Sequence, residues 1–336
     1  YNGLSLDNDD SGATGTTLFN SDTYTNSTAV KFKIGAKSAT TQASGTYTGT
    51  VNFYAVTSPG PDNTMQGFAA GSAITTCAAM STNETLTLKD SRDNSEYVIS
   101  KLADNNCWML DNLALDLTDP VILNVLDENN TNASNTTLGY LKGTTTGTTS
   151  DRYATSAVSD WLTNPTYQNS YSFSDPLVVT SYKDSVNTND ELSNEARTWK
   201  YGVYYNFCAV GAGSTCFGDG TNAGENVADS TEDICPKGWR LSGVNEPKTL
   251  ATAAFGQYIF YDATFANGYR TLLHLPLAGI VNNGTMVEQE SQGGIWNSNY
   301  YNKDGAYYLN YAPGVVLMGN VTNPFMGLSA RCILDV

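Results

Sequence analysis

The sequence has little positive charge, a single histidine and no long apolar run. It contains 17 Lys and Arg against 33 Asp and Glu, which gives a net charge of −16. This charge disfavours nucleic-acid binding, which needs a basic surface, and docking on anionic lipid. No stretch approaches the roughly 20 apolar residues of a membrane span. We therefore expect no nucleic-acid partner and no membrane contact by this segment.

Catalytic motifs are also scarce. The one histidine, His274, lies in the apolar run Leu272–Leu277, which favours a part-buried strand residue over a general base. A Gly-x-Ser-x-Gly elbow is missing. Carboxylates are plentiful, but residues such as Asp111 and Asp116 stand among turn residues, where they commonly accept backbone hydrogen bonds. We expect no enzymatic activity and no cofactor.

Six cysteines are present, without the C-x-x-C spacing of metal and redox sites. In a polar, Tyr-rich chain this number predicts three disulfides and an oxidising compartment. Fifteen pairings can be written for six cysteines. We expect Cys77–Cys107 as a hairpin staple, Cys208–Cys216 as a short loop staple, and Cys235–Cys332 as the closure of the main domain.

The composition is typical of an extracellular β protein, with few Lys and much Thr, Tyr and Asn. The chain begins at Tyr1 rather than Met, and we expect that an upstream segment has been removed. The predicted location is extracellular.

Residues 1–59 are predicted to form a small Ig-like β-sandwich module. Val30, Phe32 and Ile34 alternate with polar residues, and residues 47–55 show the same period of two. Two strands cannot form a stable sheet alone, so this module is expected to be incomplete at its N-terminus. Prolines and glycine then predict a linker at residues 60–65.

The run Asp7–Gly12 resembles the start of a calcium loop, with oxygen ligands expected from Asp7, Asp9 and Ser11. The closing bidentate Glu is absent, because Leu18 stands at that position. Such runs also form ordinary turns. Calcium binding and a simple turn therefore both remain open here, and the turn is favoured.

Residues 66–336 are predicted to form a second, β-rich domain with few helices. Residues 86–110 show three short apolar runs separated by turns, which predicts a β-meander. A strand is expected at Tyr201–Phe207. Helices are expected at Ala154–Leu162 and from Asn245 to Tyr258, and short strands after Leu272.

Aromatic residues in Gly- and Asn-rich surroundings are typical of binding loops, although tyrosine also packs well within strands. We expect an exposed recognition or assembly surface in the last part of the chain. Its residues are Trp296, Tyr300, Tyr301, Tyr307, Tyr308 and Tyr311.

Four segments, in this order, resemble the Fibrobacter succinogenes major paralogous domain, a family of secreted bacterial surface proteins, in the form carried by Saccharibacteria-type proteins. The segments are Lys101–Leu113, Tyr201–Asn206, Cys235–Leu241 and Ala330–Cys332. The resemblance covers roughly residues 66–336. A β-sandwich repeat with a Gly-Thr-Tyr-Thr strand, as at Gly45–Thr48, often precedes this domain in such proteins.

The Gly238–Leu241 motif followed by a helix also resembles the C-type-lectin-like and formylglycine-generating-enzyme group. That resemblance implies a compact α+β fold, with a disulfide joining its middle to its last strand. Two departures matter. The family has Pro-Thr or Pro-Ser where this chain has Ser242-Gly243, and the lectin calcium motif lacks its acidic partner after Trp296-Asn297.

We therefore expect a non-enzymatic, extracellular bacterial cell-surface protein that acts in adhesion or as a structural subunit of a pilus-like appendage or filament. Its expected partners are copies of itself, other surface proteins, or a host-cell glycan or protein. Two alternatives remain open, namely a carbohydrate-binding lectin-like module and a carbohydrate-active enzyme with a carboxylate pair.

Overall fold

The chain divides into two units, Tyr1–Pro61 and Asp62–Val336. The computed structural model describes residues 62–73, 75–142, 178–213, 232–282, 285–302, 305–324 and 326–335, all of them in the second unit. The predicted Ig-like module, the calcium run with Asp7, Asp9 and Ser11, and the helix expected at Ala154–Leu162 lie outside these residues.

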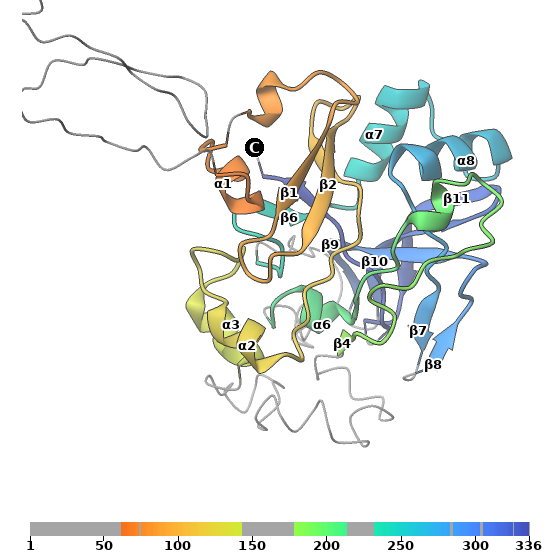
Figure 1. Cartoon of the computed structure of the whole chain (residues 1–336). Helices are drawn as coiled ribbons and strands as arrows, with labels where there is room; N and C mark the ends of the chain where they lie inside the picture. The colour runs from red at the N-terminus through yellow and green to blue at the C-terminus, as the bar shows by residue number, and fades with distance from the viewer. Residues whose placement is uncertain are drawn as a thin grey trace, which may run out of the picture. The chain divides into compact units, whose positions relative to one another are not determined.

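The central sheet of the second unit has five antiparallel strands in the order β1-β2-β3-β12-β6. Its first three strands are β1 (Thr85–Lys89), β2 (Glu96–Lys101) and β3 (Cys107–Met109), so the predicted β-meander is confirmed. The late strand β12 (Cys332–Leu334) lies between β3 and β6 (Trp239–Leu241), with Ile333 opposite both Trp108 and Arg240. The C-terminal segment thereby joins two parts of the chain that are far apart in sequence (Figure 1).

A three-stranded antiparallel sheet in the order β11-β10-β9 forms the second layer. Its strands are β9 (Gly293–Asn302), β10 (Gly305–Ala312) and β11 (Val315–Thr322). These strands are longer than the short ones predicted after Leu272. Alternating side chains enter two cores: Trp296 and Tyr308 belong to one, and Leu309 and Tyr311 to the other. Both faces of this sheet are therefore covered, which explains its high content of apolar and aromatic residues.

Two two-stranded sheets complete the β structure of the described residues. One pairs β4 (Val178–Val179) with β5 (Tyr204–Tyr205), and the other pairs β7 (Ile280–Asn282) with β8 (Thr285–Val287). The strand predicted at Tyr201–Phe207 is thus wrong in its extent. Gly202 has φ of +75°, which breaks extended structure, and Asn206 begins the next helix by accepting a hydrogen bond from the Ala209 N–H.

Six α-helices occur among the described residues, and most are short. They are α1 (Met65–Ala69), α2 (Pro120–Val125), α3 (Asn135–Leu141), α6 (Phe207–Val210), α7 (Glu246–Phe255) and α8 (Ala263–Leu272); two 3-10 turns, η1 (Cys77–Ala79) and η2 (Ala196–Thr198), accompany them. Figure 1 shows α7 and α8 together on one side of this unit, with α2 and α3 on the other. The second unit is therefore β-rich with few helices, as predicted.

The helix predicted from Asn245 corresponds to α7, although the Asn245 side chain makes no capping hydrogen bond and the helix ends at Phe255. Gly256, with φ of +73°, terminates it in the left-handed conformation. At the other end of the described chain, α1 begins at Met65, which is fully buried. The last residue of the predicted linker, at residues 60–65, is therefore the buried first residue of α1 and not part of an exposed linker.

Candidate functional site

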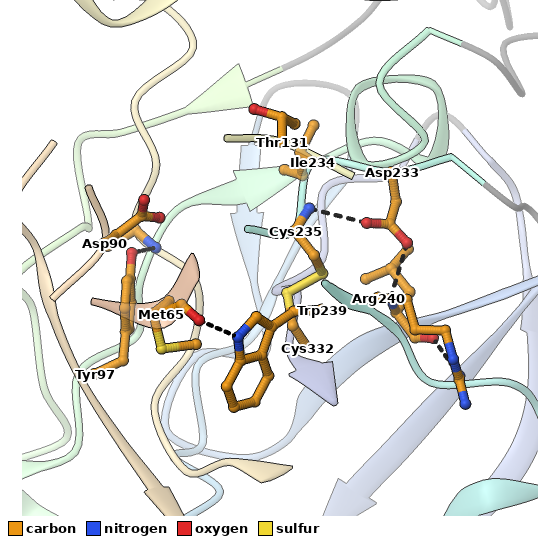
Figure 2. Close-up of a disulfide and its surroundings, with 12 residues drawn as sticks. Met65, Asp90, Tyr97, Thr131, Asp233, Ile234, Cys235, Trp239, Arg240 and Cys332 are labelled. Carbon is orange, nitrogen blue, oxygen red and sulfur yellow. Dashed lines mark hydrogen bonds between the residues drawn. A yellow bond between two sulfur atoms is a disulfide. The ribbon is translucent and has the colours of Figure 1, made fainter. Parts of the chain in front are cut away.

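The Cys235–Cys332 disulfide and the fully buried Trp239 form the centre of the second unit (Figure 2). The two cysteines are 97 residues apart in sequence, and their Cα atoms are 5.9 Å apart. The Trp239 Nε1–H donates to the Met65 carbonyl at 2.8 Å, and its ring stacks on Phe68 at 6.0 Å. The disulfide joins the segment just before β6 to β12, and the Trp239 indole connects α1 to β6.

Gly238 permits the tight turn that places Trp239. Its φ is +78°, and a Cβ atom at this position would lie 2.5 Å from the Cβ of Ala69. Any other residue would combine backbone strain with a steric clash against α1. The contacts with α1 therefore explain why Gly238 and Trp239 stand together in the motif. The turn at Gly238 and the Trp239 indole together dock α1 on β6.

A second disulfide joins Cys77, at the start of η1, to Cys107, at the start of β3. Two of the three predicted pairs are thus confirmed. Cys208 is also disulfide-bonded, and its predicted partner, Cys216, lies outside the described residues. Disulfides persist in oxidising environments and are rare in the reducing cytosol. The protein therefore belongs to an oxidising, extracellular-type environment.

Asp233 is a fully buried carboxylate beside the central disulfide (Figure 2). Its two oxygens accept the backbone N–H groups of Cys235 and Leu241, each at 2.9 Å. Burial raises the pKa of Asp233 from 3.8 to about 6, against the lowering effect of those hydrogen bonds. Its role is to fix the turn between Cys235 and β6.

The shifted pKa of Asp233 predicts a pH dependence of stability. Between about pH 4 and 6 the folded protein binds more protons at this residue than the unfolded chain, so stability falls as pH rises. A pKa change from 3.8 to about 6 corresponds to about 3 kcal/mol. We expect the free energy of unfolding of the native chain to fall by up to that amount, relative to Asp233→Asn, between about pH 4 and pH 7.

Urea denaturation over this pH range measures the difference. The difference in unfolding free energy between the two proteins cancels the contributions of groups that titrate in both, including His274. Burial and the charge of Arg331 lower the pKa of His274. If native stability rises with pH relative to the variant, the carboxylate is stabilised by folding and the explanation is wrong.

Other buried charges in the described part of the chain also make structural contacts. Burial opposes the charge on Asp90, but the adjacent Arg92 guanidinium, 2.6 Å away, holds the pKa of Asp90 below its usual value. Arg92 further donates to the Ile234 carbonyl at 2.7 Å. The Arg270–Asp190 pair, at 2.5 Å, is equally buried. These pairs tie distant segments together, as expected of buried ions that have found partners.

Arg331, in the motif before Cys332, is buried and binds neutral oxygens. It donates to the Asn112 side chain at 2.7 Å, to the His274 carbonyl at 2.7 Å and to the Leu273 carbonyl. Burial lowers the pKa of Arg331 to about 10. The Arg331 guanidinium thus connects the segment that follows β3 to the turn at the C-terminal end of α8.

His274 lies in the turn after α8, with φ of +49°, and not in a strand as predicted. Its ring stacks on Trp199 at 5.0 Å, and Nε2 is 3.7 Å from a Glu195 carboxylate oxygen. These contacts favour a packing role. Among the described residues, no cluster of three or more His, Cys, Asp or Glu side chains could hold a metal ion.

The six aromatic residues predicted to form one exposed surface are divided by the structure. Trp296 and Tyr311 are fully buried, where they donate to the carbonyls of Tyr205 and Pro276. Tyr308 is also in the core, and Tyr300 packs in part against it. Trp296, Tyr308 and Tyr311 therefore cannot form an exposed binding surface.

Tyr301 and Tyr307 remain at the surface. Tyr301 is 54% exposed, Tyr307 is half-buried, and their rings meet edge to face at 5.5 Å. They form a small exposed pair near the end of β9 and the start of β10. This pair is the part of the predicted surface that the structure leaves accessible.

A second group of exposed aromatic residues occupies Phe255–Tyr261, which runs from the last residue of α7 into the connection to α8 and is here called the aromatic loop. Phe255 is 37% exposed, Phe260 49% and Tyr261 75%. Sequence analysis placed Tyr258 at the end of a helix and predicted no exposed surface in this segment. The predicted helix extended to Tyr258 and no helix was predicted after it, so the sequence did not identify this segment as the connection between two helices.

The fold and these contacts define a β-rich, disulfide-closed domain with exposed aromatic side chains. Comparison with protein-family models, with curated proteins and with solved structures finds no match. Within the part of the chain that the structure describes, no helix is long and apolar enough to cross a membrane.

Proposed function

We propose that this chain is a non-enzymatic protein displayed on the outside of a bacterial cell, where it acts in adhesion or as a structural subunit of a surface appendage. The observation that carries the proposal is the combination of a disulfide-closed scaffold with aromatic rings held at its surface. Disulfides suit exposure outside the cell. Exposed aromatic side chains give contact area at low entropic cost.

The contacts of the buried ionisable groups support a non-catalytic role. Asp233 accepts backbone N–H groups within its own turn, Asp90 accepts from Arg92 two residues away, and Asp190 accepts from the distant Arg270. Perturbed pKa values often mark active sites, but structural ion pairs perturb them too. For Asp90 and Asp233 the contacts favour a structural cause, because Asp90 pairs with Arg92 and Asp233 accepts the backbone N–H groups of Cys235 and Leu241.

Immunogold electron microscopy of intact source cells tests the location, with an antibody raised against the purified, oxidised chain. Labelling of intact cells supports the proposal, and regular labelled filaments favour the appendage subunit. Labelling without filaments, together with saturable binding of the purified chain to neighbouring cells, favours the adhesin. Labelling only after permeabilisation contradicts the proposal, as does turnover of a glycan that one carboxylate substitution abolishes.

A further inference from the structure

The turn Glu288–Ser291, between β8 and β9, holds two residues in the left-handed backbone conformation. Glu288 has φ of +57° and Glu290 has φ of +65°. Among the described residues, three of the other non-glycine residues with positive φ are asparagines, whose short polar side chains tolerate this conformation. Glutamate has no such compensation, so the backbone of the turn is strained at two positions. Strain of this kind is typical of clamps and switch segments.

Two backbone hydrogen bonds connect this turn to the segment before β7. The Glu290 N–H donates to the Leu277 carbonyl at 2.9 Å, and the Gly279 N–H donates to the Gln292 carbonyl at 2.7 Å. The turn rests directly on Gly279, where an added Cβ atom would lie 2.7 Å from the Gln289 nitrogen. The position of the closed turn is therefore well defined, although its backbone is strained.

The surroundings of the turn contribute little buried apolar area. In β8, Thr285 is exposed and Met286 and Val287 are only half-buried, and the side chains of Glu288 and Glu290 are exposed. Figure 1 shows β7 and β8 at the edge of the second unit. Segments with few buried apolar contacts open locally at a small free-energy cost.

The closed turn lies beside two buried tyrosines. Met286 packs against the cluster that contains Tyr201 and Tyr204, and burial together with the charge of Glu290 raises the pKa of Tyr201. The Tyr204 hydroxyl donates to the Ala278 carbonyl at 2.5 Å. The Tyr201 hydroxyl is buried as well, but it has no hydrogen-bond partner among the described residues.

Two costs of the closed turn therefore disappear when it opens. The backbone at Glu288 and Glu290 can leave the left-handed conformation. The Tyr201 hydroxyl can bind water, which recovers the free energy lost by burying an unpaired polar group. Both effects favour opening, and they are opposed by the two hydrogen bonds and the thin packing of β8.

We propose that the Glu288–Ser291 turn is a flap that opens while the rest of the second unit stays folded, and that its opening exposes the Tyr201 and Tyr204 side chains. The closed flap withholds this aromatic surface from solvent. The flap does not depend on the proposed display at a cell surface.

Amide hydrogen exchange of the purified, oxidised chain, followed by NMR, tests this flap. The Glu290 and Gly279 amides report its opening, because their hydrogen bonds hold the turn closed. The Trp296 amide, which donates to the Ser329 carbonyl at 3.1 Å, reports the core. The two flap amides are expected to exchange roughly a hundredfold or more faster than the Trp296 amide.

Substitutions at Glu290 test the contribution of backbone strain. Glu290→Gly tolerates positive φ and is expected to slow exchange at the Gly279 amide about threefold or more. Glu290→Gln is the matched control, since it removes the same charge and keeps the strained backbone. It is expected to exchange like the native chain.

Two tyrosine substitutions test the unpaired hydroxyl, and their expected effects have opposite signs. Tyr201→Phe removes a hydroxyl that has no partner and is expected to slow exchange of the flap amides about threefold or more. Tyr204→Phe loses the hydrogen bond to the Ala278 carbonyl and is expected to speed it. Unchanged exchange at Trp296 shows that each variant is folded.

Three outcomes overturn the inference. The first is exchange of the flap amides as slow as that of Trp296, which means that the turn opens only when the unit unfolds. The second is equal exchange in Glu290→Gly and Glu290→Gln, which removes strain as a cause. The third is faster exchange in Tyr201→Phe, which shows that the hydroxyl stabilises the closed turn.

Discussion

Replacing both Cys235 and Cys332 by Ala is expected to lower the free energy of unfolding by about 4–5 kcal/mol. The bond closes a loop with a sequence separation of 97 residues, and the loss of chain entropy in the unfolded state grows with loop length. A change of this size is a large fraction of the stability of an ordinary domain. Urea denaturation followed by tryptophan fluorescence measures it, since Trp239 lies beside the bond.

The Cys77–Cys107 disulfide provides the matched comparison. Its sequence separation is 30, so the same relation predicts a smaller loss of about 3.6 kcal/mol on replacing both cysteines by Ala. Both variants remove one disulfide and leave two buried alanines. If the two losses are equal or reversed, loop entropy does not determine the stabilisation, and local packing around the sulfur atoms becomes the better explanation.

Arg331→Met is expected to cost about 3–5 kcal/mol of stability. The substitution keeps an unbranched apolar stem but removes the guanidinium, which leaves the Asn112 side-chain oxygen and the carbonyls of Leu273 and His274 without this buried donor. Each unsatisfied buried acceptor costs about 1–3 kcal/mol. Thermal or urea unfolding measures the total loss of stability. In hydrogen exchange, the backbone amides at the C-terminal end of α8 are expected to exchange faster than in the native chain.

Arg240→Met is the control for this prediction. Arg240 lies within β6 of the central sheet, but its side chain is 33% exposed and pairs with Glu246 and Asp335. Exposed ion pairs contribute about 0–1 kcal/mol. A loss at Arg240 as large as that at Arg331 would show that burial does not separate the two motif arginines.

The sequence was most informative where local rules and covalent chemistry agree. Cysteine spacing predicted both Cys77–Cys107 and Cys235–Cys332, and alternating apolar residues predicted β1 to β3. Turn residues separate these strands, so local preference and tertiary structure coincide. The helix α7 was predicted from apolar spacing for the same reason.

Burial of individual aromatic residues could not be predicted in the same way. Trp296 and Tyr311 stand in Gly- and Asn-rich sequence like exposed loop residues, yet both faces of the three-stranded sheet are covered. Strand periodicity gives no sign of a second covering layer, because that layer comes from distant segments. The exposed Phe260 was missed because α8 was not predicted, so the residues after Tyr258 were not recognised as a connection between helices.

The position of β12 also determines the order in which the domain can be completed during synthesis. Because β12 separates β3 from β6 in the sheet, those two strands keep open edges until residues 332–334 have been made. At ordinary synthesis rates the wait after β3 is roughly 10–45 s. Cys77 can pair with Cys107 early, whereas Cys235 must stay reduced until Cys332 arrives. Correct oxidation therefore needs a compartment that protects the unfinished sheet and the waiting thiol together.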